Sequence, residues 1–399
     1  MQLQGKHLVL GLTGGIACYK AAELCRALGK EGATVQVAMT DAATRFITPL
    51  TMQALSGRPV ATSQWDSGEP NAMPHINLTR GADAIVIAPC SADFIAKLAH
   101  GHADDLLATL CIGRPAGVPL LVAPAMNVEM WLQAPVQRNV AQLRADGVIV
   151  LGPDEGEQAC GEIGAGRMLE PAAIVEGIVA SFQPQVFAGR RVLITAGPTY
   201  EPIDAVRGIT NLSSGKMGYA IARAAREAGA EVVLVSGPTA LDAPAGVARI
   251  DVRSAAQMLD AVLARIDASD IFIGVAAVAD WRVASASTGK LKKEHGVPKL
   301  ELESNPDILA TVAKRAQASG QKPYCVGFAA ESDNLDAHAE AKRLRKGVPL
   351  LAGNLGPQTF GQDDNELALY DDRGITRLPR ADKLTLARLL IRAIAERLP

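Results

Sequence analysis

Several features of other protein classes are scarce or absent in this chain of 399 residues. None of its 6 cysteines stands in a CxxC pair, so the sequence indicates neither a zinc site nor a redox dithiol. No apolar run approaches the ~20 residues that a transmembrane helix requires. The first residues lack the basic start, apolar core and cleavage site of a signal peptide. We therefore expect a reducing, cytoplasmic setting.

The chain has almost no excess of one sign of charge over the other, and aromatic side chains are scarce. The formal net charge is −2, which argues against a nucleic-acid or membrane-surface partner. Aromatic residues make up only 4% of the chain, whereas hydrophobic residues make up 48%. Small aliphatic side chains dominate, as is typical of closely packed α/β layers. The chain is too long for one ordinary core, so we expect two domains.

Short apolar runs alternate with helical patterns along the first half of the chain. Strands are predicted at residues 8–10, 34–38, 84–88, 120–123 and 148–151. Helices are predicted at residues 17–30, 48–55, 93–99, 104–111 and 128–146. Continuous apolar strands between helices indicate a parallel sheet covered on both faces. Ligands bind such sheets beyond the carboxyl ends of the strands. The loops at those ends are residues 13–16, 40–43, 89–93 and 124–127.

The second half repeats this alternation. Strands are predicted at residues 191–195, 231–235, 271–275, 324–329 and 350–354, with a late antiparallel pair at 366–370 and 374–378. Helices are predicted at residues 217–226, 254–265, 307–318, 335–346 and 380–396. Residues 183–189 resemble an interdomain linker. The sequence therefore predicts two doubly wound, mainly parallel α/β domains, at residues 1–189 and 190–399.

A glycine turn follows the first strand and opens the first helix, with the sequence Thr-Gly-Gly-Ile-Ala at residues 13–17. Glycines let backbone amides approach a phosphate, and a helix N-terminus favours an anion. The spacing is not GxGxxG, so the turn favours a mononucleotide phosphate over a dinucleotide. The alternative is a tight strand–helix turn that binds no ligand.

His75 follows Pro74 in a proline-bounded loop at residues 71–76. The chemistry of histidine suits a base near neutral pH. A lone histidine is, however, more often structural or solvated than catalytic, so both interpretations stay open.

A Pro-Ala-Met-Asn sequence ending at Asn127 stands between a strand and a helix. Asn127 is well placed to be the N-cap of that helix. Capping explains the asparagine but not the unusual residues before it, so a functional role is equally open.

Residues 154–168 form a glycine-rich segment with one cysteine, Cys160. Packing alone does not require so many glycines around one thiol. The segment predicts a mobile lid that carries a functional cysteine, and the alternative is a free cysteine in a plain loop.

The second domain opens with a strand and a long loop at residues 197–214, followed by Gly215 and Lys216. The GxxxxGK[ST] spacing of a P-loop is absent. Asp280 follows a strand end of small residues, which would let a base or a phosphate approach closely. Three lysines at residues 290–293 add positive charge. Beside Lys216 they favour triphosphate binding, and the alternative is a solvated surface run.

Ten motifs stand in one order along the chain. They are GLTGGIACYK at 11–20, the Pro-His75 loop, APCSADFIAKLAHG at 88–101, PAMN at 124–127, ACGEIGAGRM at 159–168, TAGPTYEPIDAVRGITNLSSGKMG at 195–218, AAVADW at 276–281, KLKK at 290–293, NPDIL at 305–309 and GFAAE at 327–331. Together they resemble the bifunctional coenzyme A biosynthesis family, in which a phosphopantothenoylcysteine decarboxylase is fused to a phosphopantothenate–cysteine ligase. The similarity runs over essentially the whole chain.

The resemblance implies a flavin-dependent cysteine decarboxylase fold for the first half. In that family FMN oxidises the substrate thiol, the resulting β-thioketo acid loses carbon dioxide, and hydride then returns to the product. The resemblance assigns a catalytic role to His75, the substrate carboxylate region to Asn127, and proton donation from a flap to Cys160. The implied FMN-binding residues are Gly14, Gly15, Ile16, Thr40, Ser91, Ala92 and Asp93.

The resemblance implies that the second half is the ligase. In that reaction CTP activates 4′-phosphopantothenate as an acyl-cytidylate, and cysteine then gives 4′-phosphopantothenoylcysteine. Asn211 matches the residue that polarises the acyl intermediate, and Lys290 matches the lysine that stabilises departing pyrophosphate. Mg2+ is expected with the triphosphate, near Asp280. The implied CTP-binding residues are Ala276, Asp280, Lys290, Pro306, Asp307, Ile308, Leu309, Phe328, Lys342 and Lys346.

The resemblance also implies self-association, with trimers of decarboxylase halves and dimers of ligase halves in a homododecamer. Two rival hypotheses are a single-activity flavoprotein decarboxylase with a structural C-terminal domain and a non-enzymatic nucleotide-binding module. The first rival predicts loss of Asn211 or Lys290, and the second predicts loss of His75 or Cys160. All four residues are present.

Overall fold

The computed structural model describes residues 1–65, 73–292, 294, 298–320, 322–331, 334–355 and 362–398. Residues 71 and 72 of the predicted His75 loop and Lys293 of the lysine run lie outside these ranges. The chain forms two compact units, Met1–Phe182 and Gln183–Pro399.

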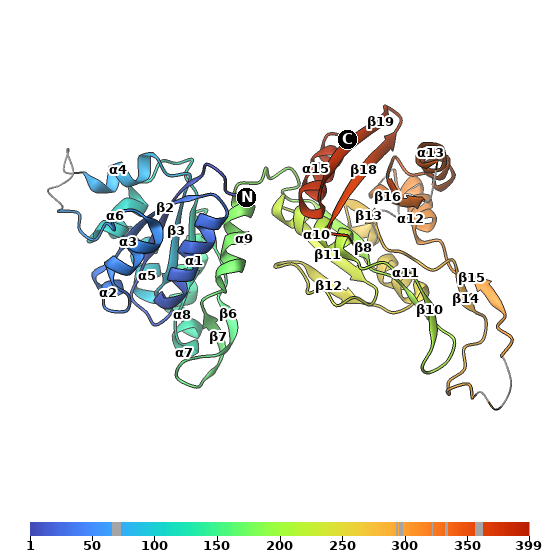
Figure 1. Cartoon of the computed structure of the whole chain (residues 1–399), viewed down its shortest axis with the longest axis horizontal. Coiled ribbons are helices and arrows are strands. Elements are labelled where there is room, and N and C mark those ends of the chain that lie inside the picture. The colour runs from blue at the N-terminus through green and yellow to red at the C-terminus, as the bar shows by residue number, and fades with distance from the viewer. Residues whose placement is uncertain are drawn as a thin grey trace. The chain divides into compact units, whose positions relative to one another are not determined.

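A five-stranded parallel sheet lies at the centre of the first unit (Figure 1). Its strands are β1 (His7–Leu12), β2 (Thr34–Met39), β3 (Ala84–Cys90), β4 (Leu120–Pro124) and β5 (Ile149–Val150). The strand order is β2-β1-β3-β4-β5, so the order reverses between β1 and β3. Ligands bind doubly wound sheets at such a reversal. The predicted parallel sheet is confirmed.

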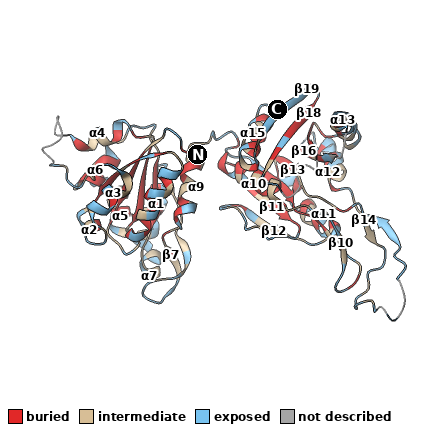
Figure 2. Ribbon diagram, in the orientation of Figure 1, coloured by how far each residue is buried: buried red, intermediate tan, exposed pale blue. Residues whose placement is uncertain are grey.

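Helices cover both faces of this sheet because its strands are apolar on both sides. Leu8 and Leu10 pack in one buried cluster with α1 and α9, whereas Val9 and Ile85 pack in another with α5, α6 and α8. Figure 2 shows the buried strands between more exposed helices. The helices are α1 (Cys18–Lys30), α2 (Asp41–Thr44), α3 (Pro49–Ser56), α4 (Pro74–Arg80), α5 (Ala92–His100), α6 (Leu106–Ile112), α7 (Val128–Leu132), α8 (Ala134–Ala145) and α9 (Pro171–Ser181).

Two predictions about local structure in this unit were wrong. His75 was predicted in a loop but lies in the first turn of α4, since Pro74 occupies a position where its missing N–H is not needed. Residues 128–146 were predicted as one helix but form α7 and α8. Gln133 is extended between them, and Pro135 follows in the first turn of α8.

The glycine-rich segment around Cys160 forms a short antiparallel hairpin of β6 (Asp154–Glu157) and β7 (Ile163–Arg167). Cys160 lies in the turn between these strands and is exposed. Gly166 has a φ of +144°, and a Cβ at this position would lie 2.4 Å from the Met126 oxygen. Only glycine allows the hairpin to approach the β4–α7 loop this closely.

An eight-stranded sheet with the order β12-β11-β8-β13-β16-β17-β18-β19 forms the centre of the second unit. Neighbouring strands from β12 to β17 pair in parallel, and the last two strands are antiparallel, as predicted. The strands are β8 (Arg191–Ala196), β11 (Glu231–Ser236), β12 (Ala248–Asp251), β13 (Ile271–Gly274), β16 (Tyr324–Glu331), β17 (Leu350–Leu355), β18 (Asp364–Asp371) and β19 (Gly374–Asp382). Edge strand β12 was not predicted.

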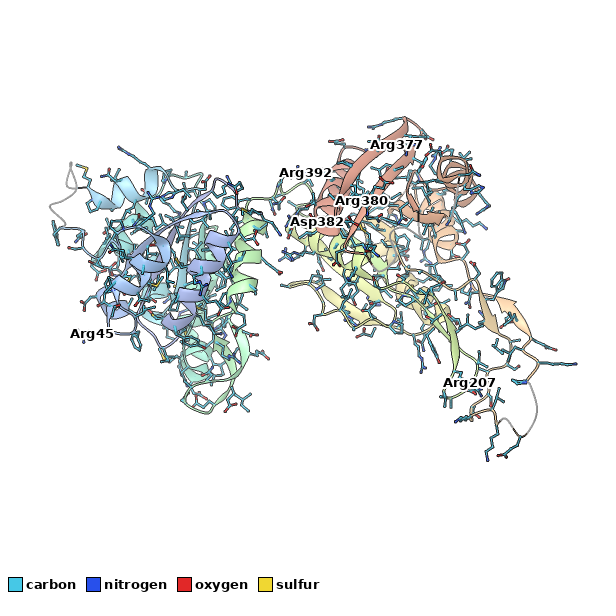
Figure 3. The ribbon with its side chains drawn as sticks, viewed as in Figure 1. Arg45, Arg207, Arg377, Arg380, Asp382 and Arg392 are labelled. Atoms are coloured by element: carbon cyan, nitrogen blue, oxygen red, sulfur yellow. The ribbon has the colours of Figure 1, made fainter. Side chains whose placement is uncertain are left out.

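The last strand runs further than its sequence suggested. The final helix was predicted from residue 380, but β19 continues to Asp382, where α15 (Lys383–Ala395) begins. Arg380 pairs with Asp364 across β18 and β19, with Nε and Oδ2 3.0 Å apart. Asp382 caps α15 through the Leu384 and Thr385 amides. Figure 3 labels Arg380 and Asp382.

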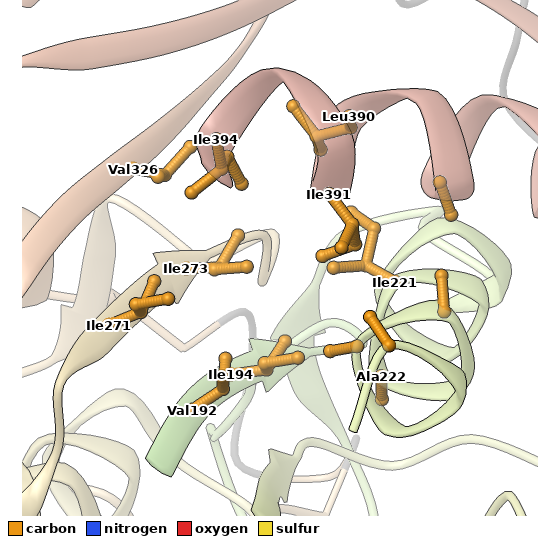
Figure 4. Close-up of a cluster of buried hydrophobic side chains, with 14 of the residues drawn as sticks. Val192, Ile194, Ile221, Ala222, Ile271, Ile273, Val326, Leu390, Ile391 and Ile394 are labelled. Carbon is orange, nitrogen blue, oxygen red and sulfur yellow. The ribbon is translucent and has the colours of Figure 1, made fainter. Parts of the chain in front are cut away.

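Helices α10 (Lys216–Glu227) and α15 pack on one face of the second sheet. Figure 4 shows Ile221 of α10 and Ile391 of α15 over Ile194 and Ile273 of the sheet. The other face packs against α11 (Ala255–Leu263), η1 (Ile266–Ala268), α12 (Ile308–Ala318) and α13 (Leu335–Lys346). The sheet therefore separates two helical layers, and its carboxyl edge lies between them.

Two short hairpins in the second unit were not predicted. One joins β9 (Tyr200–Pro202) to β10 (Gly208–Thr210) inside the long loop after β8, and the other joins β14 (Trp281–Val283) to β15 (Leu302–Ser304). Their sequences lack the apolar runs of the central strands. No helix in the described part of the chain is both long and apolar enough to cross a bilayer.

Candidate functional sites

A cavity of about 700 Å³ opens at the carboxyl edge of the first sheet. The loops after β1, β3 and β4 line one side of the cavity, and the β6–β7 hairpin lines the other side. Three of the four predicted loops therefore meet at one site. The predicted residues that line the cavity are Gly14, Gly15, Ile16, Ser91, Ala92, Asn127 and Cys160.

The loops after β1 and β3 are tied together by Thr13, which is buried. Its Oγ1 donates to the Pro89 oxygen at 2.8 Å and accepts from the Ser91 amide at 2.9 Å. On the opposite side, a Cβ at Gly14 would lie 2.6 Å from the Ala42 Cβ. The turn therefore presents the bare backbone of Gly14 and Gly15 to the cavity, as a bound phosphate would require.

Asn127 links the floor of the cavity to the hairpin. Its Oδ1 accepts from the Glu129 amide at 2.8 Å, so the predicted N-cap is confirmed. Its Nδ2 donates to the Cys160 sulfur at 3.3 Å and also to Glu162. The Val128 amide donates to Gln158 Oε1 at 2.9 Å. These contacts hold the Cys160 thiol at the rim of the cavity.

Three predicted residues of the first unit do not line this cavity. Thr40 is the N-cap of α2, where its Oγ1 accepts from the Ala43 amide at 3.2 Å. Asp93 is exposed in the first turn of α5. His75 is half-buried against the end of α6, where a Cβ on Gly113 would lie 3.8 Å from its Cδ2.

The sequence did not single out two polar contributors to the first cavity. Gln158 lines it from the hairpin, and Lys20 lines it from α1. The Lys20 side chain is 7% exposed, and its Nζ donates to the Met168 oxygen at 3.0 Å and to Glu170 Oε1 at 2.7 Å. A lysine in the first turn of an amphipathic helix gives no local sign of its burial.

A second cavity, of about 420 Å³, opens at the carboxyl edge of the second sheet. The loop after β8, the loop after β13 and the ends of β16 and β17 line it. The predicted residues that line it are Asn211, Ala276, Asp280, Phe328 and Lys342. Lys290, Lys346 and residues 306–309 are not among its lining residues.

Close backbone packing shapes this second cavity. A Cβ on Gly237 would lie 1.8 Å from the Pro198 oxygen, so only glycine fits where the β8 and β11 loops meet. Asn211 is exposed, and its Nδ2 donates to the Ala277 oxygen at 2.8 Å. The Thr199 amide donates to the same oxygen at 3.2 Å. These bonds fix the Asn211 amide against the loop after β13.

Lys290 lies on an exposed loop. The backbone of the next residue, Leu291, holds this loop in place. The Leu291 amide donates to Asp204 Oδ2 at 3.1 Å, and Arg207 donates to the Leu291 oxygen at 2.8 Å. The Asp204 side chain is 0% exposed. The Arg207 guanidinium, with neighbouring amides, holds the pKa of Asp204 well below its usual range. Figure 3 labels Arg207 at the β9–β10 hairpin.

The predicted residues on α12 and α13 form a pair of their own. Asp307 caps α12 by accepting from the Ala310 amide at 3.0 Å, and its other oxygen pairs with Lys346. Burial alone would raise the pKa of Asp307, but Lys346, the Ala310 amide and Lys342 together lower it. Asn305 ties the start of this segment to the loop after β13, since its Nδ2 donates to the Ala279 oxygen at 2.9 Å.

The second cavity also has polar residues outside the implied CTP-binding set, of which only Lys216 was linked to triphosphate binding from the sequence. Lys216 and Lys383 line it from the first turns of α10 and α15. Asn354 and Asn365 line it from β17 and β18, and both are buried. Of Lys383, Asn354 and Asn365, only Asn354 carried a positional signal, because it ends a predicted parallel strand. In the described part of the chain, no three His, Cys, Asp or Glu residues are grouped to hold a metal ion.

Comparison with known proteins agrees with this division into two sites. Residues 1–183 match the family described as flavoprotein, and residues 187–398 match the family described as the C-terminal domain of the DNA/pantothenate metabolism flavoprotein. The chain is 46% identical over 401 residues to the coenzyme A biosynthesis bifunctional protein CoaBC of Vibrio cholerae, with 99% of each chain covered. The chain belongs to this bifunctional coenzyme A biosynthesis family.

Other members of the family match at similar length. CoaBC of Escherichia coli K12 is 47% identical over 404 residues, with 100% of this chain and 98% of that protein covered. CoaBC of Bacillus subtilis is 42% identical over 401 residues, with 98% of this chain and 97% of that protein covered. Membership of the bifunctional family confirms the resemblance. The two sheets confirm the α/β class predicted from the alternation of strands and helices. The functional boundary predicted at Gly189 stays a prediction; the two compact units divide after Phe182, and Phe187 packs in the core of the second unit.

Proposed function

We propose that the protein catalyses two steps of coenzyme A biosynthesis. The second unit ligates cysteine to 4′-phosphopantothenate at the expense of CTP, and the first unit decarboxylates the product to 4′-phosphopantetheine with FMN. The observation that carries the proposal is that each unit has its own cavity, with Asn127 and Cys160 at one and Asn211 at the other. A single-activity decarboxylase would have no need of the second set of residues.

The first cavity suits FMN in size and in its backbone. Its volume of about 700 Å³ lies within the range of cofactor sites. The amides of Gly14, Gly15 and the start of α5 would hold the phosphate, and Met126 and Met168 give the cavity apolar walls. Bound FMN would supply reversible oxidation of the substrate thiol, which makes the loss of carbon dioxide easy.

The chain's own residues would then position the substrate and move a proton. The Asn127 amide would hold the substrate carboxylate until carbon dioxide leaves. The Cys160 thiol would give a proton to the decarboxylated, oxidised product as hydride is added, so that the product regains two hydrogen atoms. The hairpin would exclude water during this step, and opening of the hairpin would release the product.

His75 would serve a different copy of the chain. It does not line the cavity of its own unit, and we propose that the decarboxylase units form trimers in which His75 reaches a neighbouring cavity. With dimers of the second unit, this arrangement would give a homododecamer.

The 6 cysteines are all free, which supports the proposed cytoplasmic setting.

Mixed assemblies test this placement of His75. We expect His75→Asn and Cys160→Ser, each tested alone, to abolish formation of 4′-phosphopantetheine, because each variant removes one half of every site. Co-expression of the two variants should restore part of the activity, since some sites then combine an intact His75 with an intact Cys160. Activity no greater than the sum of the separate variants would place His75 and Cys160 of each working site in the same copy. Co-purification through two different tags shows that mixed assemblies formed.

The second cavity suits a reaction between two anions. A carboxylate oxygen of 4′-phosphopantothenate would attack the α-phosphorus of CTP and displace pyrophosphate. The cysteine amine would then attack the acyl carbon and displace CMP. Asn211 would donate to the acyl group through its amide, and Lys290 would stabilise negative charge on the departing pyrophosphate.

Lys342, Lys346 and the segment from Pro306 to Leu309 would bind the nucleotide from the α12 and α13 side. Mg2+ usually binds one or two carboxylates together with substrate phosphates. Among the described residues that line the cavity, Asp280 is the one carboxylate, which suits an ion that arrives with the triphosphate.

Substrate conversion tests the whole proposal. We expect purified protein to convert 4′-phosphopantothenate, cysteine and CTP with Mg2+ to 4′-phosphopantetheine, carbon dioxide, CMP and pyrophosphate, as measured by mass spectrometry. Replacing CTP with ATP should slow ligation at least ~10-fold, because the two bases present different groups to the site. Without any nucleotide, 4′-phosphopantothenoylcysteine should still be decarboxylated. Conversion of this compound without any ligation would favour the single-activity alternative.

A further inference from the structure

The turn of the β6–β7 hairpin carries a carboxylate close to the Cys160 thiol. Glu162 follows Cys160 by two residues, and its Oε2 lies 3.7 Å from the Cys160 sulfur. The Gln158 amide donates to the Glu162 backbone oxygen at 2.8 Å, and the Gly161 amide donates to the Gln158 backbone oxygen at 2.9 Å. These backbone bonds close the turn, so we expect Cys160 and Glu162 to move together.

Both side chains contact the same amide group, that of Asn127. Asn127 Nδ2 donates to the Glu162 carboxylate and, at 3.3 Å, to the Cys160 sulfur. An asparagine amide has two N–H groups, so the turn uses both of them. A charged acceptor forms the stronger hydrogen bond. Glu162 is therefore the main anchor of the turn on Asn127, and a bond from the Val128 amide to Gln158 Oε1 at 2.9 Å adds to it.

The Asn127 amide is also the proposed partner of the substrate carboxylate. Because the turn uses both N–H groups, the substrate carboxylate finds a donor only when the turn moves away. Two carboxylates at one amide would also repel each other. The base of the hairpin is attached separately, since the Met126 amide donates to the Gly166 oxygen at 2.9 Å. The turn can therefore leave Asn127 while the end of β7 stays in place beside α7 (Figure 1).

We propose that Glu162 is a positioning residue that competes with the substrate carboxylate for Asn127 and thereby sets the order of decarboxylation and protonation. This inference rests on the proposed decarboxylase function. While the substrate carboxylate occupies Asn127, the turn is displaced and the Cys160 thiol is kept away. Carbon dioxide leaves as a neutral molecule and frees the amide. Glu162 then returns to Asn127 and brings the thiol to the decarboxylated product.

The thiol thus arrives when the product has a carbon to protonate. The S–H bond of Cys160 breaks, and its proton goes to the carbon that carried the carboxylate. The hydride goes to the carbon bonded to sulfur, so the product gains two electrons and two hydrogen atoms. Cys160 is left as a thiolate and regains a proton from solvent, to which it is exposed. Glu162 gains and loses no proton in this sequence and acts only through Asn127 and Cys160.

Glu162→Ala removes the competitor and the anchor together. The first turnover with 4′-phosphopantothenoylcysteine, followed by rapid quenching and mass spectrometry, separates the two effects. The half-saturating substrate concentration for carbon dioxide release should fall about 3- to 10-fold, because no protein carboxylate has to be displaced. Formation of 4′-phosphopantetheine should slow about 10- to 100-fold, the loss expected for one charged hydrogen bond. The decarboxylated, oxidised aminoenethiol should accumulate between these two events.

Two further variants serve as controls. Glu162→Gln keeps an oxygen that can accept from Asn127, so it should form 4′-phosphopantetheine within about 5-fold of the wild-type rate. Glu155→Ala removes an exposed carboxylate from β6 of the same hairpin and should leave both events unchanged. 4′-Phosphopantetheine, which lacks the carboxylate, should inhibit Glu162→Ala no more strongly than it inhibits wild-type protein.

The same measurements can overturn the role of Glu162. Equal slowing of carbon dioxide release and of product formation in Glu162→Ala would mean that Glu162 only supports the structure of the site. An unchanged or higher half-saturating concentration would show that the two carboxylates do not compete. Wild-type protein that releases no carbon dioxide from 4′-phosphopantothenoylcysteine would instead contradict the decarboxylase function itself.

Discussion

Replacement of Cys160 by serine is expected to halt the first unit after carbon dioxide is lost and to reduce formation of 4′-phosphopantetheine by at least ~100-fold. The hydroxyl of serine is a much weaker acid than a thiol, so the oxidised product would not receive its proton. Asn127 Nδ2 lies 3.3 Å from the Cys160 sulfur, and a serine oxygen fits the same contact. The hairpin should therefore still close, and the substrate should still bind and lose carbon dioxide.

Mass spectrometry of the reaction of Cys160→Ser separates this outcome from a general loss of activity. The expected product is an aminoenethiol that is lighter than 4′-phosphopantetheine by one pair of hydrogen atoms, together with released carbon dioxide. Cys25→Ala is the control, because Cys25 is buried in α1 and does not line the cavity. It should give the normal product. A normal yield of 4′-phosphopantetheine from Cys160→Ser would show that another group supplies the proton.

The central sheets were predictable because their strands are continuous apolar runs with helices on both faces. Ile194 and Ile273 illustrate this pattern, since each packs in one layer while its strand neighbours face the other. Strands at the margins carry no such signal. β12 has no fully buried residue, and β15 is exposed throughout. The turn that begins α4 was missed because Pro74 was interpreted as a loop residue and not as a helix start.

The sites were predictable where a functional residue directly follows a strand. Gly14 and Asn127 were found in this way, because the carboxyl ends of parallel strands meet at one edge of the sheet. Lys20 and Lys383 were not assigned to a site. Lys20 follows the glycine turn closely, but its partners Met168 and Glu170 lie 148 and 150 residues further along the chain. Lys383 reaches its cavity from α15, which is far from Asn211 in the sequence. The roles of Lys290 and His75 come from family resemblance and stay predictions, because neither residue lines the cavity of its own unit.

Asn211→Asp is expected to reduce ligation at least ~100-fold and to leave decarboxylation unchanged. The amide of Asn211 donates to the Ala277 oxygen at 2.8 Å, and a carboxylate at this position would donate nothing and repel that oxygen. It would also face a triphosphate and a phosphate monoester with a negative charge of its own. Each unit has its own sheet and core clusters, so the first site should keep its flavin and its activity.

Two assays on the same Asn211→Asp preparation measure these effects separately. Ligation is followed by the release of pyrophosphate from CTP, and decarboxylation is followed with 4′-phosphopantothenoylcysteine added directly. Asn334→Asp makes the same chemical change at an exposed position at the start of α13, and both activities should stay at the wild-type level. Loss of both activities in Asn211→Asp would mean that the two units do not act independently. Loss of ligation alone would mean that the amide of Asn211 acts on a substrate that only the second unit binds.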